Sequence, residues 1–184
     1  MSLRTAASQA ARKSARQEKP LKVSTALAPA RIPQGFFFVQ DTREQEPLFN
    51  HPPLGLDVLT ETVHDGDYTI KGLEPYFAIE RKKMSDLYGY LGNEWKAKTE
   101  AKLVRFRDMI KRGGWVALVI EASEADVLAG YEHSKLPPEN VRAKLLSVEV
   151  RYGVHVYYNR DRDAMARWVL DRAIKFYNIK REVL

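Results

Sequence analysis

Residues 66–86 bring together acidic and basic side chains that could act on a phosphate group. This segment contains Asp67, Glu80 and Lys82. On a β-strand, side chains two positions apart point to the same face. If residues 76–82 are extended, Glu80 and Lys82 therefore project together and Arg81 points away. The spacing predicts a carboxylate and an ammonium group side by side.

A second carboxylate can join this pair through a hairpin. Asp67 lies at the head of the preceding strand candidate, and a turn through Gly72 and Pro75 would bring it alongside Glu80. Two carboxylates can hold Mg²⁺, which prefers oxygen ligands and keeps several waters. The bound ion would neutralise phosphate charge and lower the pKa of a coordinated water. Lys82 could serve either as a base or as an electrostatic stabiliser. The pattern predicts a metal-dependent nuclease site.

The same residues also have purely structural interpretations. Asp67 belongs to a turn signal at residues 65–67, and Glu80 could lie on an exposed strand edge of alternating charge. An acid such as Asp86 in the first turn of a helix interacts favourably with the helix dipole. However, Glu80 follows an apolar run at 77–79 that we expect to be buried, where an unpaired charge is costly. This argues that Glu80 belongs to a functional site and does not lie on an exposed strand edge.

Composition limits the class of protein. The 184 residues suit one domain with a hydrophobic core, and the absence of cysteine excludes disulfides and thiolate metal sites. No apolar run approaches the roughly 18 residues that a membrane span needs. We expect no membrane association and no secretion. The expected location is the cytoplasm for a bacterial or phage protein, or the nucleus for a eukaryotic one.

The net charge of +6 is concentrated at the start of the chain. Residues 1–34 hold seven of the 30 basic residues and one of the 24 acids, so residues 35–184 contain 23 of each. This arm has too little apolar content to fold alone, so we expect a disordered basic arm at 1–34. It could attract a phosphate backbone or be a solvated tail. Its composition also resembles an organelle transit peptide.

Residues 35–184 alternate between strand and helix signals after an initial group of strands. This order predicts a single α/β domain, a sandwich with a mixed central sheet. Ser85 could cap the first helix and Asn93 the second. The expected strands are 35–41, 58–63, 68–70, 76–80, 115–120 and 154–158, and the expected helices are 85–91, 93–112, 123–128, 138–152 and 161–178.

Three other features of the sequence have competing interpretations. Basic residues crowd the predicted helix 93–112, interleaved with acids, which is typical of a solvated face but could also track phosphates. Tyr68, Tyr88 and Tyr90 could stack on bases, although their positions suit packing equally well. His64 could be a ligand, or a solvated loop histidine.

Two blocks of the sequence resemble the nuclease domain of the XPF-type, structure-specific excision-repair endonucleases. The family signature is Gly-Asp, a spacer, Glu-Arg-Lys, three residues, then Asp. The chain has Gly-Asp at 66–67, Glu-Arg-Lys at 80–82, and Asp86. The upstream Asp-x-Arg-Glu block is matched at 41–44. The resemblance covers roughly 36–180, and its specific motifs lie within 41–87.

This resemblance implies a fold, a cofactor and roles for individual residues. It implies a three-layer, restriction-endonuclease-like α/β sandwich across an XPF-type nuclease domain at 35–184. The implied cofactor is Mg²⁺ or Mn²⁺. The implied roles are metal binding for Asp41, Asp67 and Glu80, catalysis for these acids with Lys82 and Arg81, and support for Arg43, Glu44 and Asp86.

The expected function is a Mg²⁺-dependent endodeoxyribonuclease that cuts branched, flap or junction DNA in repair or recombination. Larger members carry helix-hairpin-helix modules after the nuclease domain, for which the chain ending at Leu184 leaves no room. A homodimer or a protein partner could supply the missing grip on DNA. The alternatives are a non-catalytic DNA-binding or scaffold module on the same fold, and a resolvase- or restriction-like nuclease.

Overall fold

The computed structural model describes residues 31–53, 55–92 and 95–183. Most of the predicted basic arm and the predicted cap Asn93 lie outside these residues. Among the described helices, none is both long and apolar enough to cross a membrane.

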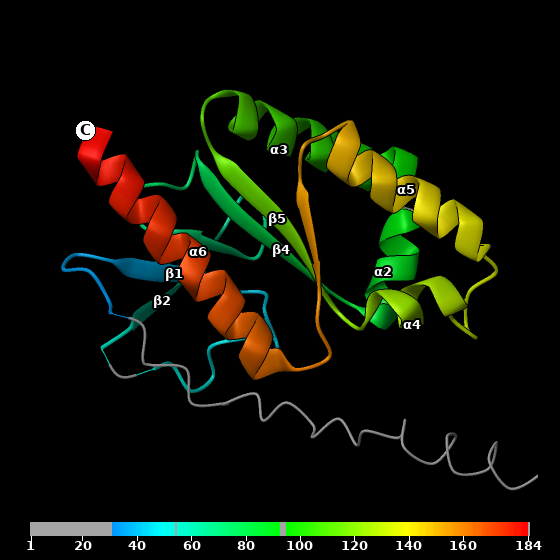
Figure 1. Cartoon of the computed structure of the whole chain (residues 1–184), viewed down its shortest axis with the longest axis horizontal. Helices are drawn as coiled ribbons and strands as arrows, with labels where there is room; N and C mark the ends of the chain where they lie inside the picture. Colours follow the sequence, from blue (N-terminus) through cyan, green and yellow to red (C-terminus); the bar gives the residue numbers. More distant parts are fainter. Residues whose placement is uncertain (1–30, 54, 93–94, 184) are drawn as a thin grey trace, which may run out of the picture.

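A mixed sheet forms the centre of the described chain (Figure 1). Its strand order is β2-β1-β3-β4-β5-β6. Strand β1 runs parallel to β2 and antiparallel to β3, β3 is antiparallel to β4, and β4, β5 and β6 are mutually parallel. The strands are β1 (Phe37–Asp41), β2 (Asp57–Glu61), β3 (Tyr68–Ile70), β4 (Phe77–Lys83), β5 (Trp115–Glu121) and β6 (His155–Tyr158).

Helices cover both faces of the sheet, which gives three layers (Figure 1). The long helix α6 (Arg162–Val183) packs on one face. The opposite face carries α2 (Met84–Leu91), α3 (Glu100–Lys111), α4 (Glu124–Ala129) and α5 (Pro138–Val150), with a π-helix at Trp95–Thr99 leading into α3.

Side-chain alternation along β4 assigns each residue to one of these faces. Ala78 packs in the core beneath α2, α3 and α5, whereas Phe77 and Ile79 pack in the core beneath α6. Because successive side chains of a strand point to opposite faces, Glu80 lies on the α3 side and Arg81 on the α6 side. The predicted separation of these two residues is confirmed.

Most predicted elements are present, several of them with shifted ends, and the differences at α2 and α6 are the most informative. Helix α2 begins at Met84 after Lys83, and no side chain caps it, so the capping role predicted for Ser85 is wrong. Helix α6 continues to Val183 instead of ending at Asn178. No glycine or proline follows Asn178 to stop the helix, which accounts for the longer element.

Gly66 allows the head of β3 to approach β4 closely. Its φ is +92°, and a Cβ added there would lie 2.7 Å from the carbonyl oxygen of Ile79. The neighbouring Asp67 amide donates a hydrogen bond of 2.7 Å to that same oxygen. Glycine at this position therefore lets Asp67 lie directly against β4.

We expect Gly66→Ala to lower the free energy of unfolding by at least about 3 kcal/mol, because it combines backbone strain with a backbone clash. Gly72→Ala is the matched control. Gly72 has φ +81° but nothing within 4 Å of an added Cβ, so it should cost only the strain, about 1–2 kcal/mol. Urea denaturation measures both. Equal losses would show that the close approach to Ile79 does not matter.

Candidate active site

Asp67, Glu80 and Lys82 meet on the α3 side of the sheet, as their spacing predicts. The Lys82 ammonium lies 2.7 Å from Glu80 Oε1 and 3.9 Å from Asp67 Oδ2. Strand pairing positions the carboxylates, since Tyr68 of β3 is opposite Ile79 of β4. The Arg81 amide then donates a 2.7 Å hydrogen bond to Asp67 Oδ2. The two acids and the lysine thus form one cluster.

Lys102 is a functional candidate that the sequence analysis assigned only to the charged surface of a long helix. It extends from α3 so that its ammonium donates to both oxygens of Glu80 at 2.9 Å. Glu80 itself is fully buried and is held by Lys82 as well. No short-range pattern could have identified Lys102, because the contact joins residues 22 positions apart.

Burial and neighbouring charges shift the pKa values of this cluster in different directions. Burial and, after it, the charge of Glu80 raise the pKa of Asp67 to about 6, because Lys82 and the Arg81 amide offset these effects only in part. Burial also raises the pKa of Glu80, but the two lysines lower it by more, to below its ordinary value. Burial lowers the pKa of Lys82, and Glu80 and Asp67 outweigh that effect.

A buried hydroxyl lies next to the two acids. The hydroxyl of Tyr90 on α2 has no hydrogen-bond partner among the described residues. Burial and the charges of Glu80 and Asp67 together raise its pKa, and the Lys82 ammonium lies 5.3 Å from its ring centre. Buried hydroxyls normally have a partner, so this group fits a site that takes up water or a ligand.

Asp41 lies beside Asp67 in the sheet, but its carboxylate is already occupied. The Asp41 amide donates to the Asp67 carbonyl at 2.8 Å. Its two carboxylate oxygens accept hydrogen bonds from the Arg43 amide and guanidinium and from the Val63 amide. These bonds, chiefly those from the Arg43 side chain, lower the Asp41 pKa to about 2. A metal could reach Asp41 only after Arg43 moves away.

Arg81 holds the opposite face of β4 in place. Its guanidinium contacts Glu44 and Glu121, each at 2.8 Å. Glu121 at the end of β5 also accepts from Arg162 at the start of α6. Glu44 in turn accepts from the Tyr68 hydroxyl at 2.9 Å. These ion pairs join β4 to three other parts of the chain.

The remaining residues of the motif lie at the periphery. Asp86 is exposed on α2 and accepts a 3.3 Å hydrogen bond from Ser85, although its charge still contributes to the raised pKa of Lys82. Arg43 is largely exposed while it covers Asp41. His64 is exposed on a loop. The structure therefore brings Asp67, Glu80 and Lys82 together and places Asp86 and His64 outside.

The cluster suits a divalent cation with few protein ligands. Within the described ranges, no three His, Asp or Glu side chains converge as a metal site. Asp67 and Glu80 nevertheless disfavour each other's ionisation, and a cation between them would relieve that repulsion. Mg²⁺ commonly binds through one or two carboxylates and retains several waters. The donor set and the unpaired Tyr90 hydroxyl fit such an ion.

Comparisons with known proteins identify a family and a fold. The sequence matches the ERCC4 domain family over residues 23–171. No curated protein shows significant sequence similarity to the chain. Among solved structures, XPF from Aeropyrum pernix is similar with a TM-score of 0.56 and 18% identity, over 74% of this chain and 59% of that one. XPF from Aeropyrum pernix in complex with DNA gives 0.57 and 17%, over 78% and 65%.

These structural matches show the fold. The predicted α/β sandwich of the restriction-endonuclease-like type, with its mixed sheet between helical layers, is confirmed. The chain spans about three fifths of the length of the XPF structures that it matches.

The unfavourable ionisation of Asp67 in the folded state leads to a stability prediction for the metal-free protein. Its folded pKa of about 6 lies above the ordinary value of 3.8 for an aspartate, so folding disfavours the charged form. This penalty is absent below pH 3.8 and complete above about pH 6. Asp67→Asn should therefore raise the free energy of unfolding by up to about 3 kcal/mol at pH 7.5 and by little at pH 4.

Thermal unfolding in EDTA at the two pH values checks this expectation, and Asp57→Asn on the exposed edge strand β2 is the control. If Asp67→Asn is less stable than the wild type at pH 7.5, ionisation of Asp67 does not destabilise the folded protein.

Proposed function

Because the chain belongs to the ERCC4 domain family, we propose that it is a metal-dependent DNA endonuclease. The proposed reaction is hydrolysis of a phosphodiester bond in branched, flap or junction DNA during repair or recombination. The observation that carries this proposal is the buried pair Asp67 and Glu80 with the Lys82 ammonium at its edge. A similar XPF structure contains DNA, which supports DNA as the proposed substrate.

In this proposal Asp67 and Glu80 hold Mg²⁺ or Mn²⁺, and Asp41 becomes a third ligand when Arg43 releases it. The bound ion would neutralise phosphate charge and lower the pKa of a coordinated water. Because Lys102 occupies both oxygens of Glu80, it must give way to the ion at least in part. Lys102 and Arg43 thus compete with the metal for its carboxylates.

Other residues of the chain have roles in binding and positioning. Lys82 would donate to a phosphate oxygen and offset the charge that develops during attack. The unpaired Tyr90 hydroxyl would orient a water beside the acids. Arg81 is a positioning residue, since its ion pairs with Glu44 and Glu121 face away from Lys82. Glu44, Arg43 and Asp86 support the arrangement.

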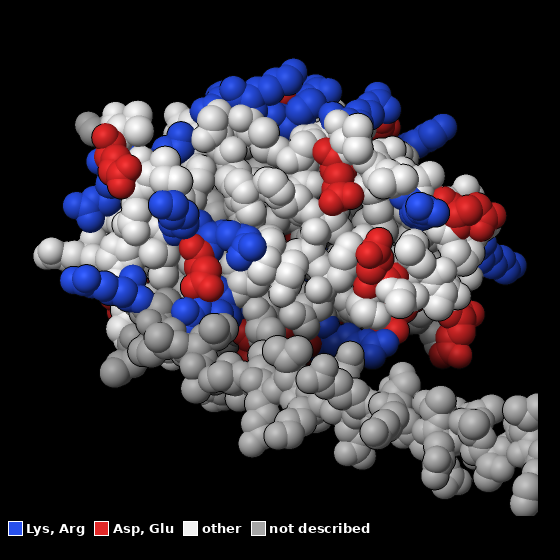
Figure 2. Space-filling model, in the orientation of Figure 1, with Lys and Arg blue, Asp and Glu red and all other residues white. Residues whose placement is uncertain are grey.

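The surface beside this cluster suits a DNA backbone. Figure 2 shows basic side chains gathered along the edge of the molecule formed by α3. Arg105 there pairs with Asp65, whereas Lys96, Lys111 and Arg112 are exposed. We propose that this edge tracks phosphates, within a nuclease domain at 35–184 that follows a basic arm at 1–34. A homodimer or a protein partner would add further contacts with the DNA.

A non-catalytic DNA-binding module is the second candidate. The observation that favours it is the complete engagement of Asp41 and Glu80 by basic side chains, as in purely structural ion pairs. Metal binding and cleavage separate the two candidates, since a structural ion-pair cluster would show neither.

We expect Asp67→Ala to abolish cleavage of flap and fork DNA in Mg²⁺ or Mn²⁺, because one of the proposed metal ligands is lost. DNA binding should stay intact or tighten, since a negative charge near the phosphates is removed. Gel assays of labelled substrates measure both. Asp57→Ala, on exposed β2, should cut normally. An active Asp67→Ala enzyme would contradict the site, and an inert wild type with normal DNA binding would favour the non-catalytic module.

Lys102→Met should tighten Mn²⁺ binding by at least about tenfold, because it removes a cation that competes for Glu80. Calorimetric titration of the DNA-free protein measures this affinity. The control Lys111→Met alters an exposed lysine of the same helix and should change little. Unchanged or weaker binding in Lys102→Met would mean that the ion does not share Glu80 with this lysine.

A further inference from the structure

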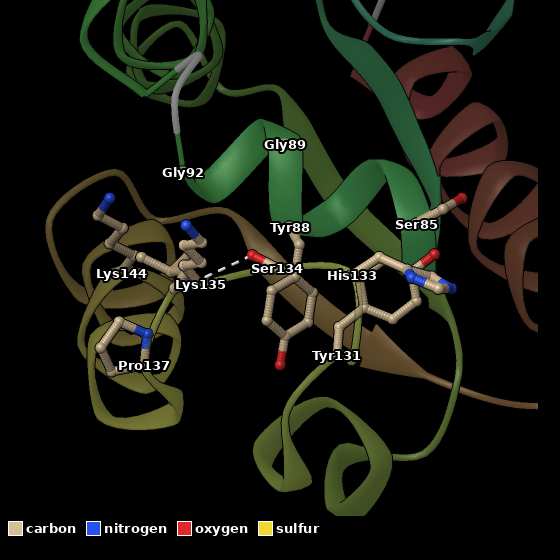
Figure 3. Close-up of a pocket in the computed structure, with 11 residues that line it drawn as sticks. Ser85, Tyr88, Gly89, Gly92, Tyr131, His133, Ser134, Lys135, Pro137 and Lys144 are labelled. Carbon is tan, nitrogen blue, oxygen red and sulfur yellow. Dashed lines mark hydrogen bonds between the residues drawn. The ribbon is translucent and has the colours of Figure 1, made fainter.

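A large cavity lies beside α2 (Figure 3). Its volume is about 740 Å³, which is within the range of small-ligand sites. Residues of α2, the loop at 131–137 and Lys144 of α5 line it, and none of the lining residues is acidic. The cavity could therefore accept a negatively charged group.

Gly89 forms part of the cavity wall at a position where the fold does not require glycine. It lies within α2, where glycine is destabilising relative to alanine. A Cβ added at Gly89 would have nothing within 4 Å, so no neighbouring atom excludes a larger residue. Gly92, also in the wall, differs because a Cβ there would lie 2.6 Å from the Tyr88 carbonyl oxygen. Open space beside a helical glycine suits the close approach of a ligand.

The wall has aromatic groups on one side and ammonium groups on the other (Figure 3). Tyr131 packs against Tyr88 with ring centres 5.5 Å apart and against His133 at 5.3 Å. Lys135 is exposed on the loop. Lys144 is fixed by donating to the Leu91 carbonyl, and its ammonium has further donors to offer.

Helix α2 connects this cavity to the acidic cluster. It begins directly after β4, so Ser85 at the cavity edge is three residues beyond Lys82. Within α2, Tyr90 contacts Lys82, and the adjacent residue Gly89 borders the cavity. A strand that leaves the cluster across the start of α2 would reach the cavity.

We infer that this cavity binds one nucleotide of a single DNA strand next to the scissile bond. The base lies against Tyr131 and the sugar passes over Gly89. The phosphate accepts hydrogen bonds from Lys135 and Lys144. Stacking on an aromatic ring and contact with lysine are the usual means of holding single strands without reading their sequence. The inference rests on the proposed function, since it takes DNA as the ligand, and it predicts a preference for substrates with an unpaired strand.

The test fills the cavity without disturbing the fold. Gly89→Leu projects a side chain into the open space and should not lower the melting temperature, because leucine favours a helix. Fluorescence anisotropy in EDTA, with the full chain, compares a labelled flap with a blunt duplex of equal length. We expect about tenfold weaker binding of the flap and unchanged binding of the duplex. Ala143→Leu, exposed on α5 outside the cavity, is the matched control and should change neither.

A second variant tests the phosphate contact. Lys135→Ala should reduce the slope of log affinity against log salt for the flap by about 0.7, the value for one phosphate on a single strand. Lys175→Ala, exposed on α6, should leave that slope unchanged.

The possible results separate this inference from the proposed function. If Gly89→Leu binds the flap as tightly as wild type, or weakens flap and duplex equally, the cavity is not a single-strand site even if the enzyme cuts DNA. Failure of the wild type to bind the flap also overturns the inference. Selective loss of flap binding supports it even if no DNA is cut.

Discussion

The buried charge of Glu80 is the constraint on which the site and much of the fold depend. A carboxylate removed from water is costly unless opposite charges and hydrogen bonds compensate it. Two lysines do so here: Lys82 comes from the same strand, and Lys102 comes from α3. The two lysines therefore hold α3 against the sheet, and they also keep the Glu80 carboxylate ionised beside Asp67. A divalent cation could replace part of this compensation without changing the backbone.

Strand β4 separates two kinds of charged interaction on its two faces. Glu80 and Lys82 form the cluster on the α3 side, while Arg81 on the other side joins Glu44 and Glu121. Arg162 brings the start of α6 into the same network through Glu121. An ion-pair network on one face thus limits the movement of the strand that carries the candidate catalytic residues on the other. Asp67 depends on the same strand, because the Arg81 amide binds its carboxylate.

The sequence predicted well what short-range alternation determines. The period of two along β4 correctly placed Glu80 with Lys82 and Arg81 opposite, and the turn predicted through Gly72 and Pro75 correctly brought β3 alongside. The competition at Asp41 was not predictable in the same way, because the supporting role expected of Arg43 did not reveal that its guanidinium occupies that carboxylate. Lys102 was missed because its contact depends on how α3 packs against the sheet. The unpaired hydroxyl of Tyr90 likewise follows from tertiary packing, which no pattern of residues within α2 reveals.

The central claim is that Asp67 and Glu80 share a divalent cation beside Lys82. A crystal structure of the protein soaked in Mn²⁺, with anomalous scattering to locate the ion, tests this claim most directly. The account predicts an ion bound by oxygens of both Asp67 and Glu80, with Lys102 displaced from Glu80. An ion bound elsewhere, or Glu80 still held by both lysines at saturating Mn²⁺, would contradict it.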